Sequence, residues 1–237
     1  MHRLIRFLRN PVRPIKRRVQ YAIQKRRYTA AQGYQEEQYW TDRLGKYGLD
    51  KRGVGIDARS SEENEAMYAD ARRVFLDVVA REGIDFSRSR VLEIGCGVGF
   101  YTDIVKEQLC PDYTGVDITD ALFAELRRRH SNYRFVKGDV TAVPLPTPAD
   151  VILMIDVTQH IVDDGKFAAA MMNIREHLLP GGVFIVTSWL TPEREQDLFY
   201  HVRRPMRLYE QEFPGHSFSE PVPFRDKFLF TIRRPAE

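Results

Sequence analysis

A glycine-rich turn directly after a short buried strand constrains this chain more than any other feature. Residues 91–100 read VLEIGCGVGF, with glycines at 95, 97 and 99. Glycine lets a chain turn sharply after a strand and brings the backbone close to a ligand. The helix expected next would direct its free N–H groups into the same turn. Because Phe100 follows Gly99, the spacing is GxGxG and differs from a GxGxxG nucleotide fingerprint.

Strands and helices alternate from residue 90 onward. The apolar runs predict strands at 90–94, 113–118, 134–137, 149–155 and 183–189, with two more near 217–222 and 227–233. Helical patterns fill the gaps at 100–109, 120–130, 163–178 and 205–213. The alternation predicts an α/β fold, a doubly wound, seven-stranded and mostly parallel sheet.

The residues before this region predict an N-terminal helical extension. Aromatic and leucine side chains recur at helical spacing over 34–50, and a second helix is expected at about 62–81. Glu63 stands three residues after Ser60, as in a capping box at the start of that helix. We therefore expect a basic arm at 1–28, a helical cap at 29–85 and the sheet domain at 86–237.

Charge is distributed unevenly along the chain. Residues 1–28 hold ten Lys and Arg and no acidic residue, although the net charge of all 237 residues is only +3. The remainder is therefore acidic, and the split indicates an anionic partner for the basic arm. Two cysteines cannot form a disulfide framework, and no apolar run is long enough to span a bilayer. We expect a cytoplasmic protein without a signal peptide.

The arm has the pattern of an amphipathic membrane-surface segment. Apolar residues alternate with arginines over 4–8, and prolines at 11 and 14 interrupt the pattern. A second short basic helix is expected after them, with Ile15, Val19, Ala22 and Ile23 on one face. Such segments lie in a membrane interface, so we expect the anionic inner membrane surface as a partner. An acidic protein, an anionic glycan or a solvated tail without a partner are the alternatives.

The second strand adds an acidic residue suited to a ribose. It ends in Asp117, 18 residues beyond Gly99. A carboxylate at this place can accept hydrogen bonds from both ribose hydroxyls, as it does in dinucleotide sites.

As a set, these motifs resemble the class I S-adenosylmethionine-dependent methyltransferases. The resemblance covers about 90–190 and rests on ExGxGxG at 93–99, Asp117, Gly138-Asp139 and LPGG at 179–182. It implies the Rossmann-like methyltransferase fold, with S-adenosylmethionine as the cofactor. The residues that it implies for cofactor binding are Glu93, Gly95, Cys96, Gly97, Gly99, Asp117, Ile118, Asp139, Val140 and Asp156. Cys96 is expected as a small turn residue, not a nucleophile.

The segment after the fourth strand, Asp156 to Ile161, supplies the catalytic candidates. Ligands of such sheets bind beyond the carboxyl ends of the strands, so these side chains should face the cleft. Methyl transfer is an in-line displacement, and a hydroxyl acceptor must also lose a proton. His160 is the candidate base and Asp156 the residue where cofactor and substrate meet. The alternative is that His160 only packs beside the cofactor.

Missing motifs narrow the acceptor. DVTQ stands where amino-methylating nucleic-acid enzymes carry [DN]-P-P-[FY], and neither the Pro-Cys nucleophile of cytosine enzymes nor the loops of arginine methyltransferases are found. The acceptor class that remains is a small molecule or a glycan that receives the methyl group on an oxygen atom. We therefore expect O-methylation of a sugar or glycan precursor. Another small metabolite, a lipid quinone, or a binding role on a vestigial fold are the alternatives. Nucleic acid is disfavoured because the basic charge is confined to one end.

Acceptor recognition is expected from the parts of the chain outside the core of the sheet domain. The polar and aromatic residues suited to it are Tyr39, Trp40, Arg43, Arg59, Asn64, Tyr68, Trp189 and Arg225. The alternative for Trp40 and Tyr47 is that they anchor their helix on the core. The sequence identifies no metal ligand, and it leaves open the oligomeric state and whether a divalent metal assists.

Overall fold

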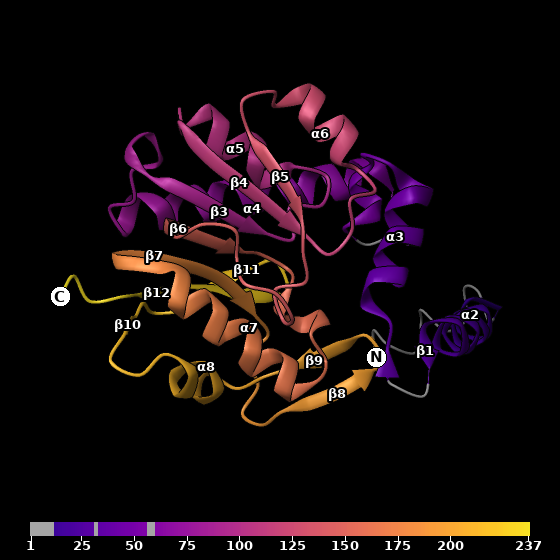
Figure 1. The fold of residues 1–237 in the computed structure, drawn as a ribbon. Helices are drawn as coiled ribbons and strands as arrows, with labels where there is room; N and C mark the ends of the chain where they lie inside the picture. The colour runs from indigo at the N-terminus through magenta and orange to yellow at the C-terminus, as the bar shows by residue number, and fades with distance from the viewer. Residues whose placement is uncertain (1–11, 31–32, 56–59) are drawn as a thin grey trace.

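A central, mostly parallel sheet with helices on both faces forms the body of the protein (Figure 1). The computed structural model describes residues 12–30, 33–55 and 60–237. Within them the sheet has the order β10-β12-β7-β6-β3-β4-β5, and β11 pairs with β12 outside this path. Its strands are β3 (Arg90–Ile94), β4 (Asp112–Asp117), β5 (Arg134–Lys137), β6 (Ala149–Met154), β7 (Leu178–Ser188), β10 (Ser217–Phe218), β11 (Val222–Phe224) and β12 (Lys227–Arg233).

Successive residues of the central strands point to opposite faces of the sheet and are buried on both. Val91 of β3 belongs to a core shared with α4 (Ser61–Arg81), α5 (Phe100–Glu107) and α6 (Phe123–Arg129). Leu92, its neighbour, belongs to the core beneath α7 (Asp164–His177) and α8 (Met206–Glu212). The order in which the parallel strands are added to the sheet reverses between β3 and β6, and sheets of this kind bind ligands at that point.

The predicted doubly wound sheet is confirmed, and its last part differs in detail. The segment expected as one strand over 217–222 forms two short strands, β10 and β11, so eight strands take part within the described residues. Ser219, Glu220 and Pro221 lie between the two, and the proline cannot donate a ladder hydrogen bond, which stops a continuous strand. A separate hairpin of β8 (Glu195–Leu198) and β9 (His201–Arg203) was not predicted.

The N-terminal extension contains one longer helix where the sequence predicts a short one. Helix α2 (Val12–Tyr28) begins before Pro14, because a proline in the first turn needs no N–H partner. The predicted helix over 34–50 is shorter: β1 (Thr29–Ala30) pairs with β2 (Gly33–Tyr34), and α3 (Glu36–Tyr47) follows. Residues 1–11, which carry the first predicted arm helix, lie outside the described residues.

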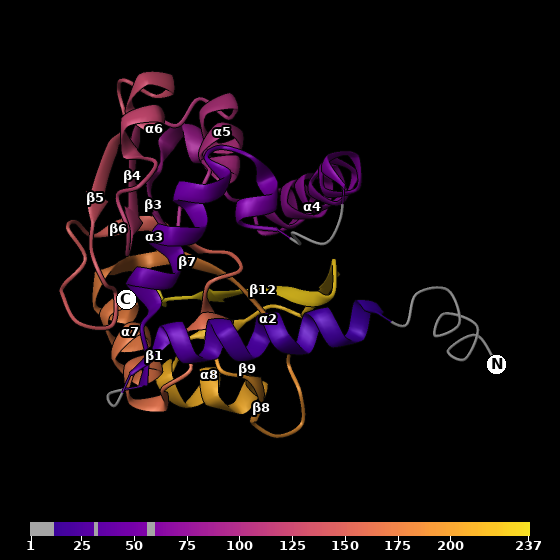
Figure 2. The same ribbon diagram turned by 90° about the vertical axis from the view of Figure 1, so that its right-hand side faces the viewer.

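Helix α3 lies at the ligand-binding edge of the sheet, and α2 lies further out, beside α3 and β1 (Figures 1 and 2). Helix α3 leads into the 3₁₀ turn η1 (Lys51–Gly53), and Ser60 with Glu63 forms the predicted capping box of α4. Short 3₁₀ turns also precede β3, as η2 (Phe86–Arg88), and follow β6, as η3 (Thr158–His160). In the described parts of the chain, no helix combines the length and apolar character needed to cross a bilayer.

Candidate active site

A deep pocket opens at the carboxyl ends of β3, β4 and β6. It encloses about 840 Å³, a volume that includes open solvent at its mouth. The predicted site residues that line it are Trp40, Tyr68, Glu93, Gly95, Cys96, Gly97, Asp117, Ile118, Val140, Asp156 and His160. These predicted residues come from six separate segments of the sequence that the fold brings to one place.

The glycine turn forms one bare wall of this pocket. Gly95 and Gly97 have φ angles of 78° and 48°, which side-chain-bearing residues rarely adopt. A Cβ on Gly95 would lie 2.3 Å from Cγ2 of Val157, so no larger residue fits between the turn and the end of β6. Gly99 does not line the pocket; it precedes the first turn of α5, where a Cβ would meet Leu126.

Asp117 lies buried at the end of β4 with its carboxylate fixed by the backbone. Its Oδ2 accepts the Gly97 N–H at 2.9 Å, and its Oδ1 accepts the Thr119 N–H at 3.1 Å. Burial raises the pKa of this carboxyl to about 6, and the two backbone donors act against that rise. Through these two hydrogen bonds, the Asp117 carboxylate links the glycine turn to the residues after β4.

Glu93 occupies the interior of the sheet beneath the turn. Its Oε2 accepts the Tyr113 hydroxyl at 2.5 Å and the Thr102 hydroxyl at 3.1 Å. Burial raises the pKa of Glu93 to about 8, although both hydrogen bonds favour the charged form. Glu93 of β3 is therefore hydrogen-bonded to residues of β4 and α5, and it also lines the pocket.

The residues after β5 divide between the pocket and the turn that holds them. Val140 lines the pocket opposite Ile118, and both contribute apolar surface. Asp139 does not line it; its Oδ1 accepts the N–H and the hydroxyl of Thr141 at 2.9 and 2.8 Å. The cofactor role that the resemblance implies for Asp139 stays a prediction.

His160 stands at the pocket within a group of aromatic rings. Its Nδ1 lies 3.0 Å from the carbonyl oxygen of Tyr200, which can only accept, so Nδ1 carries the proton and Nε2 the lone pair. The Trp40 ring meets it edge-on at 4.8 Å, and the His201 ring lies 4.7 Å away. Burial lowers the pKa of His160 well below 6.5, so the imidazole is neutral near pH 7.

Asp156 is held between two cations from the β11–β12 turn. It forms ion pairs with Arg225 and with Lys227, whose Nζ lies 3.2 Å from its Oδ1. Arg225 and Lys227 expose only 8% and 9% of their side chains, so water screens these pairs weakly. The guanidinium of Arg225 also lies 5.3 Å from the centre of the Tyr68 ring.

Of the predicted acceptor residues, the structure brings Trp40 and Tyr68 into the pocket lining. Arg225 does not line the pocket itself but forms an ion pair with Asp156, which does. Trp189 does not line it either, and its Nε1 donates to Asp226 at 3.2 Å. Trp40 lines the pocket and also packs against the aromatic cluster of Tyr28, Tyr34, Tyr39 and Phe199. Tyr39, another predicted acceptor residue, lies in that cluster and not in the pocket lining.

Two other predicted acceptor residues, Arg43 and Asn64, lie away from the lining. Arg43 donates to the carbonyl oxygens of residues 52, 53 and 55 and holds the η1 loop in place. Asn64 is buried at the start of α4, where its amide donates to the Ser60 carbonyl at 2.9 Å. Arg59 lies outside the described residues. A part in acceptor binding for any of the three stays a prediction.

Sequence reasoning missed residues that complete the pocket. Tyr101, at the start of α5, lines it with a buried hydroxyl that finds no hydrogen-bond partner among the described residues. Leu44 and Val54 close the side toward α3 and η1. The position of Tyr101, six residues after Gly95 on the helix that the turn begins, is the one signal that could have identified it.

Comparison with known proteins agrees with this geometry. A family model described as a methyltransferase domain matches residues 65–220, more than half of the chain. A probable S-adenosylmethionine-dependent methyltransferase from Mycolicibacterium smegmatis is 32% identical over 105 residues, which are 44% of this chain and 38% of that protein. The dTDP-3-amino-3,4,6-trideoxy-alpha-D-glucopyranose N,N-dimethyltransferase of Streptomyces venezuelae is 26% identical over 153 residues, 63% of each chain. The matched part is thus less than two thirds of these relatives.

Solved structures share the fold. The 1,6-didemethyltoxoflavin-N1-methyltransferase of Burkholderia thailandensis aligns with a TM-score of 0.59 at 19% identity, covering 83% of this chain and 87% of that one. An amino pentose methyltransferase from Micromonospora echinaspora aligns with a TM-score of 0.56 at 17% identity, covering 71% and 91%. The family model matches a sheet in which the glycine turn follows β3 and Asp117 ends β4. This match identifies the chain as a member of the class I S-adenosylmethionine-dependent methyltransferases.

Proposed function

We propose that this protein transfers the methyl group of S-adenosylmethionine to a hydroxyl group of a sugar or glycan precursor. The observation that carries the proposal is His160. Its tautomer is fixed by the Tyr200 carbonyl, its Nε2 keeps a lone pair, and it lines the same pocket as the glycine turn and Asp117. A proton acceptor beside a cofactor site is what methylation of a hydroxyl needs.

The residues of the pocket fit the cofactor. The bare backbone of Gly95 to Gly97 leaves room for its amino-acid part, and the buried Asp117 carboxylate suits the ribose hydroxyls. Ile118 and Val140 offer apolar surface to an adenine ring. The unpartnered Tyr101 hydroxyl supplies one more polar group for the bound molecule.

The cap formed by α3 and η1 would keep water away from the reacting atoms. Leu44 and Val54 close the pocket on this side, and Leu44 belongs to an apolar cluster with Val98 of the glycine turn. When bound, S-adenosylmethionine supplies a methyl group on a positively charged sulfur. Because the displacement is in-line, the main task of the chain is to hold the acceptor oxygen in the correct direction.

His160 would remove the acceptor proton. Since its pKa is lowered by burial, the imidazole is unprotonated at pH 7 and its Nε2 can accept a proton as the new C–O bond forms. The Tyr200 carbonyl, 3.0 Å from Nδ1, stabilises the imidazolium that results. Trp40 and Tyr68 offer aromatic surfaces on which a sugar ring can stack.

A second acceptor, the amino group of an amino sugar, is favoured by Asp156. This carboxylate lines the pocket and could hold an ammonium group before methyl transfer. The names of the Streptomyces venezuelae relative and of the Micromonospora echinaspora enzyme both describe methylation of amino sugars. Ion pairing of Asp156 with Arg225 and Lys227 argues against it, because both cations already compensate the carboxylate.

The test is transfer of an isotope-labelled methyl group to a panel of acceptors. Pairs of nucleotide sugars that differ only in a hydroxyl or an amino group separate the two acceptors, and a lipid quinone covers the remaining class. We expect label on the hydroxy sugar, lost in His160→Gln. Label on the amino sugar alone would replace the proposal by the second candidate. Intact cofactor binding without turnover on any acceptor would indicate a binding role.

A further inference from the structure

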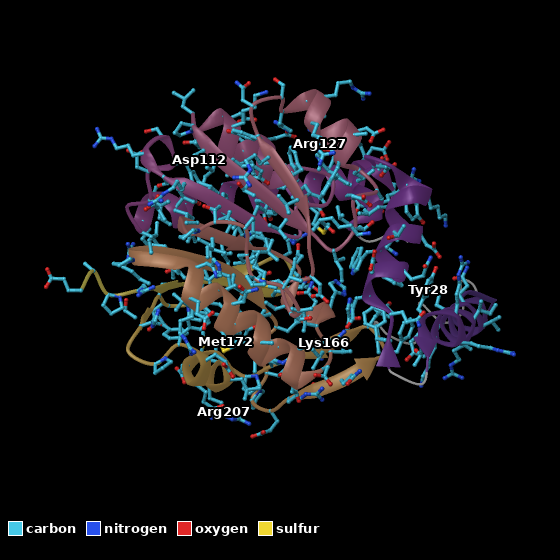
Figure 3. The ribbon with its side chains drawn as sticks, in the orientation of Figure 1. Tyr28, Asp112, Arg127, Lys166, Met172 and Arg207 are labelled. Atoms are coloured by element: carbon cyan, nitrogen blue, oxygen red, sulfur yellow. The ribbon has the colours of Figure 1, made fainter. Side chains whose placement is uncertain are left out.

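Helix α2 packs against the protein through Tyr21 and Tyr28 and leaves the aliphatic side chains of Val19 and Ile23 exposed. Tyr28, which lies between α2 and α3 (Figure 3), is 7% exposed and meets the Tyr39 ring edge-on at 5.2 Å. Val19 and Ile23, by contrast, are 53% and 61% exposed. A surface helix normally buries its apolar stripe against the core. Nothing in the described fold covers the aliphatic face of α2.

The outward face is continuous and mixes aliphatic with basic side chains. With 3.6 residues per turn, Val19, Ala22, Ile23 and Arg26 lie on the side of the helix opposite Tyr21 and Tyr28. All four are exposed, as is Arg18 at the border of this face. The whole helix contains seven Lys and Arg and no acidic residue. The outward face therefore combines exposed aliphatic side chains with Arg26 and, at its border, Arg18, on a helix that is basic as a whole.

The opposite face of α2 is firmly attached. The Tyr28 hydroxyl donates to Asp42 at 2.9 Å, and Arg27 pairs with the same carboxylate at 2.6 Å. Near the middle of the helix, the Phe199 N–H donates to the Tyr21 hydroxyl at 3.2 Å. The helix can thus bind a partner on its outer side without leaving the protein.

We propose that the outer face of α2 binds an anionic membrane surface and lies in its interface. Aliphatic side chains set among cations can enter the boundary between headgroups and acyl chains while the cations meet lipid phosphates. A nucleic acid would engage Arg18 and Arg26 but would leave Val19 and Ile23 in water. Ile23 also lines a groove between α2 and α3, in which Arg43 and Lys46 add basic side chains and, among the described residues, Asp42 is the one acidic residue.

The experiment is co-sedimentation of the full chain with vesicles of phosphatidylcholine containing 40% phosphatidylglycerol. Four variants are compared with the unmodified protein. Val19→Ser with Ile23→Ser removes the aliphatic side chains, and Arg18→Gln with Arg26→Gln removes two charges. Met172→Ser on α7 and the pair Arg73→Gln with Arg88→Gln are matched controls, because they change exposed residues of the same kinds elsewhere. Pure phosphatidylcholine and high salt complete the design.

We expect binding to anionic vesicles at low salt and much weaker binding to neutral ones. Each lost charge should weaken partitioning about fivefold, and the aliphatic double variant about tenfold or more. Both control variants should bind as the unmodified chain does. Equal binding of the aliphatic double variant, or preference for a duplex nucleic acid over anionic vesicles, would overturn the proposal. Methyl transfer to a soluble acceptor is unaffected by these substitutions, so the outcome is separate from that of the proposed function.

Discussion

Asp156 and Arg225 form an ion pair at the rim of the pocket, and both hold left-handed backbone with φ angles of 61° and 56°. Neither is a glycine, so each conformation is strained by roughly 1–3 kcal/mol. The backbone of Asp156 is held in this conformation by a hydrogen bond from its N–H to the Thr187 hydroxyl at 2.8 Å. Both strained residues meet in one mostly buried contact beside the pocket, and strained backbone of this kind clusters at functional sites.

Replacing Arg225 by glutamine should destabilise the protein markedly. The substitution leaves the mostly buried Asp156 carboxylate with Lys227 alone, and loss of one partner of a buried pair costs about 3 kcal/mol. The measurement is urea unfolding of the purified chain. As a control, Arg88→Gln removes an ion pair whose arginine is 87% exposed, and it should change stability by about 0.5 kcal/mol or less. Equal effects of the two substitutions would contradict the assigned burial.

Asp117→Ala should weaken binding of S-adenosylmethionine at least tenfold. The ribose hydroxyls lose a charged acceptor, and hydrogen bonds to a charged group are worth roughly 1.5–3 kcal/mol each. Titration calorimetry measures the affinity directly. Asp120→Ala, three residues further on, is the control because its side chain is 63% exposed and, within the described residues, forms an ion pair only with Lys137, at 3.9 Å. Unchanged affinity in Asp117→Ala would remove this residue from the cofactor site.

The sequence predicted best what depends on neighbouring residues. The parallel strands, the left-handed glycine turn and the capping box of Ser60 and Glu63 each arise from a local pattern, and each was confirmed. Asp117 could be placed beside the turn because adjacent parallel strands end at the same edge of the sheet. A local pattern combined with one rule of topology was enough for this half of the site.

Contacts between distant segments could not be predicted in the same way. The β8–β9 hairpin carries the Tyr200 carbonyl that orients His160, yet its sequence has no glycine turn to announce it. Arg225 was assigned to a turn, and only the folded sheet brings that turn to Asp156. The outward aliphatic face of α2 follows from which of its two faces finds aromatic partners, which helical periodicity does not decide.

Turnover should persist below the ordinary pKa of histidine if His160 is the base. Because the folded protein holds the pKa of His160 well below 6.5, the imidazole stays unprotonated as pH falls through that value. We expect kcat to remain level from pH 8 to 6.5 and to decline only at lower pH. His160→Ala should lower kcat roughly 10²–10⁴-fold with cofactor affinity nearly intact. His216→Gln, a histidine in the turn after α8, should leave both quantities unchanged, and a parallel small loss of kcat and affinity in His160→Ala would indicate packing alone.

Glu93 should make the protein less stable as pH rises. Its pKa is raised from 4.5 to about 8 in the folded state, so folding favours the protonated form. The stabilisation is complete below pH 4.5 and is lost as pH increases through 8. Between pH 5 and 8 the loss is on the order of 3–4 kcal/mol, and Glu93→Gln should lack it. Urea unfolding at the two pH values measures this difference; Glu107→Gln, on the surface, should follow the unmodified chain, and a parallel profile for Glu93→Gln would contradict the prediction.

Phe199→Ala should loosen α2 and the β8–β9 hairpin together and slow catalysis. The Phe199 ring is 8% exposed and lies between the rings of Tyr21 and Tyr34, at 5.6 Å from each. Its removal leaves a cavity worth roughly 3 kcal/mol or more, placed where helix and hairpin meet. Since the adjacent Tyr200 carbonyl orients His160, kcat should fall while affinity for S-adenosylmethionine changes little.

Hydrogen exchange resolves the local effect, because amides of α2 and the hairpin should exchange faster and those of β3 and β6 should not. Phe228→Ala, whose ring is 37% exposed on β12, is the matched control and should alter neither exchange nor kcat. If Phe199→Ala left the exchange of α2 unchanged, the aromatic cluster would not be what holds this helix to the protein. If exchange rose and kcat stayed constant, the hairpin would be attached to α2 without being needed to orient His160.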